Sequence, residues 1–183
     1  MSLPIRSLTL VCIYMFGVAQ LVRAEEIFFL HDADEHQWCG YANKDNWTSH
    51  FQREDVDVMG SLMYSNRRIT QINMRQISAS GDWALDDEYT LNPSQNLQQL
   101  KRDLGYFSEN ERVLESFRIR DGKAVLISRS ASNLTTHKPS SSSRPIDAFG
   151  SWPIITKVTD FPFQSLLQAI GEVRSKGSYC LHD

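Results

Sequence analysis

Apolar and polar residues alternate along the middle of the chain, which is the pattern of strands with one buried face. Residues 56–64 carry apolar side chains at a period of two. Residues 69–77 follow with a break in phase between Ile69 and Ile72, which predicts a bulge. Residues 83–91 alternate again after a turn. The pattern therefore predicts three consecutive antiparallel strands.

A hairpin is predicted further along, because Asp-Gly between apolar strands favours a two-residue turn. Asp121-Gly122 separates the apolar positions of 113–119 from those of 124–127. Two other short apolar runs are expected to be strands, one near the start of the chain and one near its end: 27–30 and 154–158.

Two segments show helical spacing. Asn92-Pro93 has the form of a helix N-cap followed by proline, and three leucines at helical spacing follow, so a helix is predicted over about 93–104. A second helix is predicted over about 162–176, ending near Gly177. Its apolar stripe consists of Phe163, Leu166, Leu167, Ile170 and Val173.

The order of these elements does not alternate strand and helix, so it predicts an α+β fold. We expect a single domain in which a twisted antiparallel sheet of about five to six strands packs against two helices. Residues 131–152 contain a Ser/Pro-rich stretch that buries little, and they are predicted to form a flexible surface loop.

The first 24 residues have the pattern of a signal peptide. Arg6 precedes an apolar core at 8–21, and Val22-Arg23-Ala24 resembles a cleavage site. The core is too short to span a bilayer comfortably. Residues 1–24 are therefore expected to be removed, leaving 25–183 as one exported domain, periplasmic or secreted, with no membrane span.

Removal of that segment changes both the charge and the cysteine count. It takes two arginines and no acidic residue, so the net charge moves from −3 to −5, which argues against nucleic acid as a partner. Cys12 is lost, and Cys39 and Cys180 remain. Two cysteines in an oxidising compartment most simply form one disulfide, and two free thiols are the alternative.

One cluster of ligand-type side chains stands out near the start of the domain. His31, Asp34 and His36 lie within six residues, and a Cys39–Cys180 disulfide would bring His182 towards them. Imidazole and carboxylate groups suit zinc, copper or nickel, although the spacing matches no metal motif known to us. The alternative is a solvated polar loop. No cofactor other than such a divalent metal is predicted.

The chain carries no catalytic motif of the GxSxG, HExxH, P-loop or dinucleotide-binding type. The leading hypothesis is a small exported, non-catalytic binding protein, such as an inhibitor or neutralising partner of another exported protein. Loops on rigid scaffolds often carry binding surfaces, which favours residues 131–152 as the contact. The alternative is an exported hydrolase, metal-dependent or not, that uses the segment from His31 to His36.

Overall fold

A computed structural model describes residues 24–51, 56–141 and 153–182. The predicted signal segment, except for Ala24, lies outside the described residues. The same holds for residues 142–152 of the predicted loop. Of the helices in the described part of the chain, none is long and apolar enough to cross a membrane.

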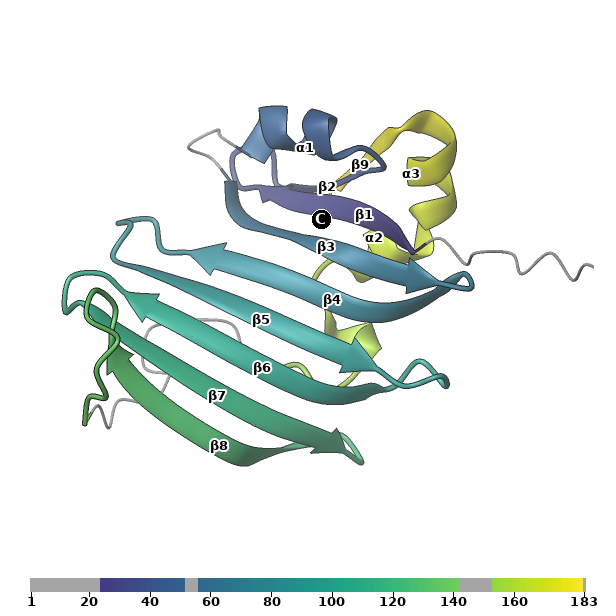
Figure 1. The fold of residues 1–183 in the computed structure, drawn as a ribbon. Coiled ribbons are helices and arrows are strands. Elements are labelled where there is room, and N and C mark those ends of the chain that lie inside the picture. The colour runs from purple at the N-terminus through teal and green to yellow at the C-terminus, as the bar shows by residue number, and fades with distance from the viewer. Residues whose placement is uncertain (1–23, 52–55, 142–152, 183) are drawn as a thin grey trace, which may run out of the picture.

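The described residues form one nine-stranded sheet in which every neighbouring pair of strands is antiparallel. Its strand order is β8-β7-β6-β5-β4-β3-β1-β2-β9 (Figure 1). The strands are β1 (Glu25–Asp32), β2 (Gln37–Tyr41), β3 (Val56–Ser65), β4 (Arg68–Ile77), β5 (Trp83–Leu91), β6 (Leu97–Tyr106), β7 (Glu111–Arg120), β8 (Lys123–Asn133) and β9 (Ser178–His182).

The predicted α+β class with five to six strands and two helices is wrong, because the described chain is mostly sheet. Its helices are short, and none of them lies between β3 and β8. They are α1 (Lys44–Phe51), the 3-10 helix η2 (Val158–Asp160), α2 (Gln164–Gln168) and α3 (Ile170–Lys176).

The predicted helix over 93–104 is the clearest correction, since this segment leads into strand β6. Leu97 pairs with Leu91 and Gln99 pairs with Thr90, so Gln98 is an extra residue at a bulge. The bulge puts Leu97 and Leu100 on the same buried face although they are three residues apart. A strand with a bulge therefore produced the spacing of a helix.

The short strands near the two ends of the described chain were only partly predicted. Residues 154–158 do not form a strand, whereas 37–41 and 178–182 do. The last two are short and pair with each other across most of the sequence. A single-sequence pattern carries little information about such a pairing.

Several local predictions are confirmed. The three strands over 56–91 are present, and Thr70 is the extra residue of a bulge because Ile69 pairs with Tyr64 and Gln71 with Met63. The hairpin at Asp121-Gly122 joins β7 to β8.

The C-terminal helical segment is confirmed as helical, but it divides into α2 and α3 around Ala169. Its buried face includes Leu166, Ile170 and Val173, and Gly177 ends it with a left-handed φ of 83°. The helices cover β2, where Gly40 allows close approach. A Cβ at Gly40 would lie 2.8 Å from the Cγ2 atom of Val173.

The two faces of the sheet differ in what they bury. We call the face covered by α2 and α3 the inner face. It carries the main core, in which Phe29 packs on Phe163 and Tyr89 on Phe161. The opposite, outer face carries a smaller core at β1 and β2, where Trp47 of α1 stacks on Phe28. Figure 1 shows α1 at this edge and β8 at the opposite edge.

Candidate functional site

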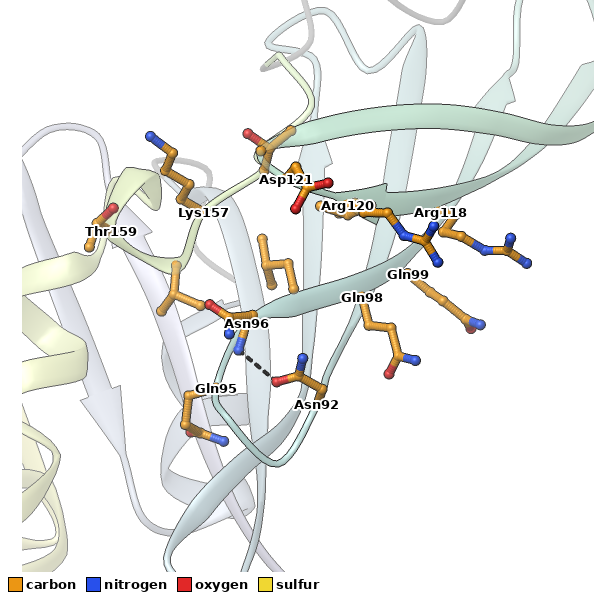
Figure 2. A pocket seen from close by; sticks show the side chains of 15 residues that line it. Asn92, Gln95, Asn96, Gln98, Gln99, Arg118, Arg120, Asp121, Lys157 and Thr159 are labelled. Carbon is orange, nitrogen blue, oxygen red and sulfur yellow. Dashed lines mark hydrogen bonds between the residues drawn. The ribbon is translucent and has the colours of Figure 1, made fainter.

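A hollow of about 950 Å³ opens at one end of the sheet, where three segments distant in sequence meet (Figure 2). These segments are the turn between β5 and β6, the hairpin between β7 and β8, and residues 156–159. Leu97, Ile119 and Val158 supply apolar contacts. The polar residues that line it are Asn92, Gln95, Asn96, Gln98, Gln99, Arg118, Arg120, Asp121, Thr156, Lys157 and Thr159. We call it the amide pocket.

The first wall of the amide pocket is fixed by its own side chains. The side-chain oxygen of Asn92, Oδ1, accepts hydrogen bonds from the backbone N–H groups of Ser94, at 2.9 Å, and Asn96, at 3.1 Å. Gln95, with a φ of 63°, holds both backbone groups of Ile69: its amide donates to the carbonyl and its oxygen accepts from the N–H. Asn92 and Gln95 therefore shape the pocket, and Gln98 and Gln99 remain exposed.

The second wall is set by the hairpin. Asp121 and Gly122 both have left-handed φ values, 52° and 69°, as a two-residue turn of this kind requires. The register then places Arg120 opposite Lys123, and it places Arg118 between Gln99 on β6 and Val125 on β8. In Figure 2 the side chains of Arg118 and Arg120 lie on the same side of the pocket as those of Gln98 and Gln99 on the neighbouring strand.

Positive charge collects at this end of a chain whose net charge is −3. Arg118, Arg120 and Lys157 line the amide pocket, and Lys123 adjoins it. Within the described parts of the chain, none of these four side chains makes a hydrogen bond or an ion pair. Like charges directly opposite each other, as at Arg120 and Lys123, destabilise a strand pair.

The functional groups of the amide pocket suit the binding of carboxylate and amide groups. Guanidinium and ammonium groups bind carboxylates through charge-assisted hydrogen bonds. Side-chain amides offer both donors and acceptors, which match the backbone of a peptide. Among the described lining residues there is one carboxylate, on Asp121, and no histidine, cysteine or serine.

A second hollow, of about 850 Å³, lies on the outer face and is lined by residues of α1, β1 and β3 to β7, Lys44 among them. Its charges are arranged differently. Three ion pairs cross neighbouring strands there: Arg75–Asp86 at 3.7 Å, Lys101–Glu88 at 2.9 Å and Arg112–Asp103. Burial raises the pKa of the Asp86 carboxyl, and the positive charge of Arg75 opposes that shift. Because these charges are already paired, they offer less to an incoming charged ligand.

The predicted metal residues lie at one end of β1, β2 and β9. His31 is hydrogen-bonded to Asp57, with 2.7 Å between Nδ1 and Oδ1. Asp34 and His36 are exposed in the turn after β1. His182 on β9 is the register partner of Gln37, the residue that follows His36. In the described chain no three His, Cys, Asp or Glu side chains are grouped to hold a metal ion. The metal site and the alternative exported hydrolase, metal-dependent or not, stay predictions.

The disulfide between Cys39 and Cys180 is confirmed. The two residues are register partners on β2 and β9, and their Cα atoms are 4.0 Å apart. The bond closes a separation of 141 residues at the sheet edge farthest from β8.

Sequence reasoning missed the amide pocket. Its signal was present in two places: the amide-rich run 95–99 and the arginines at 118 and 120, which alternate on a strand beside a predicted turn. The first was assigned to a helix and the second was not singled out.

Comparison with known proteins gives no family for the chain: no protein-family model, curated protein or solved structure matches it.

Proposed function

We propose that this is an exported, non-catalytic binding protein whose amide pocket holds an acidic part of another exported protein. The observation that carries the proposal is the group of cations without a described partner, Arg118, Arg120, Lys123 and Lys157, around an amide-lined hollow. Their mutual repulsion costs stability in the free protein, and an anionic partner would relieve that cost.

Two further features support the proposal. Carboxylates of the partner match the guanidinium groups of Arg118 and Arg120, and its main chain matches the amides of Gln98 and Gln99. The Cys39–Cys180 disulfide is compatible with an oxidising compartment, and it supports export to that extent.

The experiment is a calorimetric titration of the purified protein with a capped hexaglutamate peptide, and with hexaserine as the uncharged comparison. We expect hexaglutamate to bind and its affinity to fall with added salt, because exposed charges are screened. The double variant Arg118→Gln/Arg120→Gln should weaken binding by about thirtyfold, because two lost charge-assisted bonds of ~1 kcal/mol each sum to ~2 kcal/mol.

Lys44→Gln is the matched control, because it removes an exposed cation on α1, outside the amide pocket. Equal weakening by Lys44→Gln would mean that only net charge matters, and it would contradict the proposal. Trigalacturonate is titrated in parallel. Preference for this acidic saccharide over hexaglutamate would replace the protein partner by a glycan.

A further inference from the structure

Strand β8 presents an apolar edge next to the amide pocket. It is the last strand of the sheet and pairs with β7 on one side only. Val125, Leu126 and Ile127 are consecutive in it, and they are 59%, 49% and 56% exposed. Only two other large hydrophobic side chains of the described residues are classed as exposed, Phe107 and Leu114. An edge strand of this kind is a template for pairing with another chain.

The chain itself covers the far end of this edge. The backbone N–H of Ser140 donates to the carbonyl of Ala131 at 3.0 Å, and the N–H of Asn133 donates to the carbonyl of Lys138 at 2.9 Å. Ser132 and Pro139 form a bridge between these two bonds. The pairing with this returning segment reaches only the last residues of β8. In the part of β8 nearest the amide pocket, Lys123 and residues 125–128 are exposed and Ala124 is half-buried.

The open part of β8 is short, because Ile127 is the extra residue of a bulge. Residues 123–126 are in regular register with β7, from Lys123 opposite Arg120 to Leu126 opposite Phe117. In an edge strand, alternate residues direct their N–H and C=O groups away from the sheet. An added strand of four to six residues therefore fits this edge.

The charges around the exposed part of β8 indicate which side chains an added strand would carry. β8 contains Lys123 and Arg129 and no acidic residue. Arg118 and Arg120 lie next to it on β7. Arg129 is already ion-paired to Glu115 at 3.2 Å, so Lys123, Arg118 and Arg120 are the cations that an added strand would meet. A second copy of β8 would bring another Lys123 and no carboxylate to pair with them. Charge complementarity favours an acidic strand instead.

We propose that β8 accepts an extended acidic segment of the partner as a tenth strand, in which carboxylates lie beside Lys123 and the arginines of β7. This proposal rests on the proposed function and specifies how the partner is held. Main-chain hydrogen bonds to β8 would supply affinity, and alternate side chains would supply specificity, as in other cases of strand addition.

The test uses three capped hexapeptides and the whole protein. The first alternates valine and glutamate. The second has the same sequence with its alternate amides N-methylated, which blocks one hydrogen-bonding edge. The third has lysine in place of glutamate. We expect the first to bind and to slow hydrogen exchange of the backbone amides in 124–128. N-methylation should weaken binding by about tenfold, as expected when buried hydrogen bonds are lost.

The variant Lys123→Glu should weaken binding of the acidic peptide and strengthen binding of the lysine peptide. Lys44→Glu should change neither affinity. The N-methylated peptide is compared on the unaltered protein, so the test does not depend on the folding of any variant.

The outcomes separate the two proposals. If the N-methylated peptide binds as well as the parent and hexaglutamate still requires Arg118 and Arg120, strand addition is wrong and the proposed function stands. If no acidic peptide binds, both proposals fail. If sedimentation shows a dimer that Leu126→Lys dissociates, the occupant is a second copy and the acidic strand is wrong.

Discussion

Two arginines on neighbouring strands show how this sheet uses the same side chain in opposite ways. Arg102 of β6 is fully buried on the inner face, where the register sets it between Asp87 and Glu115, and its Nε lies 2.9 Å from an Asp87 oxygen. Arg118 of β7 is exposed at the end of the sheet beside the amide of Gln99. The buried, paired charge in the centre of the sheet stabilises the fold. The exposed charge at the end of the sheet remains available to a partner.

The largest effect is expected when the buried pair is broken. Asp87→Leu removes the buried carboxylate that is ion-paired to Arg102, which should lower the free energy of unfolding by ~3–5 kcal/mol. The double variant Asp87→Leu/Arg102→Met should recover much of that loss, because no isolated charge remains. Denaturant unfolding measures both. Arg118→Met is the control and should change stability by less than ~0.5 kcal/mol. Equal losses for Asp87→Leu and Arg118→Met would break the comparison.

Removal of the disulfide should lower stability without changing peptide affinity. Replacement of Cys39 and Cys180 by serine should cost ~2–5 kcal/mol, because the bond closes a long loop of the unfolded chain. Since the bond lies at the edge opposite β8, peptide affinity at a temperature where the variant is folded should not change. Thermal unfolding and calorimetric titration provide the two readouts. A loss of affinity that tracks the loss of stability would show that the amide pocket is not independent of this edge.

A third arginine, Arg174, lies beside a buried tyrosine, and that tyrosine should make stability depend on pH in the alkaline range. Arg174 is ion-paired to Glu25 and lies over the ring of Tyr64, 4.6 Å from its centroid. Burial raises the pKa of the Tyr64 hydroxyl to about 12, and the charge of Arg174 opposes that shift. The unfolded chain loses this proton near pH 10 and the folded chain does not.

Stability should therefore be complete below pH 10 and fall as the pH rises from 10 to 12, by at most ~2–3 kcal/mol from this group. Tyr64→Phe should flatten that part of the pH profile, as measured by unfolding in guanidinium at each pH. Burial raises the pKa of Tyr89 in the same direction, so some slope should remain. An unchanged profile in Tyr64→Phe would contradict this assignment.

The smallest expected effect has the opposite sign. Lys123→Gln removes the like charge opposite Arg120, so it should raise stability by a few tenths of a kcal/mol. The same variant should weaken binding of the acidic peptide. A gain in stability coupled to a loss of affinity is the behaviour expected of residues kept for recognition. If Lys123→Gln lowers stability, repulsion between Lys123 and Arg120 does not destabilise the sheet, and this prediction is wrong.

Much of the sheet could be predicted from the sequence, because local alternation marks β3, β4 and β5 and Asp121-Gly122 marks the hairpin. The disulfide followed from cysteine usage. Strand β6 could not be predicted, since a bulge at Gln98 and the buried Arg102 together removed the alternation of a strand.

The amide pocket was not predicted for a different reason. Its walls come from 92–99, 118–122 and 156–159, which meet only once the sheet has formed. Each segment alone looks like an ordinary polar turn. The functional meaning of Arg118 depends on its neighbours in space, and these are not its neighbours in sequence.

The most direct test of the central claim is a titration of the isotope-labelled protein with hexaglutamate, followed by backbone amide chemical shifts. We predict that the shifts concentrate at the amide pocket, including Gln99, Arg118, Gly122 and Lys157, and that the ion-paired residues Arg75 and Asp86 do not respond. Shifts centred on the outer-face ladder, or spread evenly over all exposed cations, would contradict it.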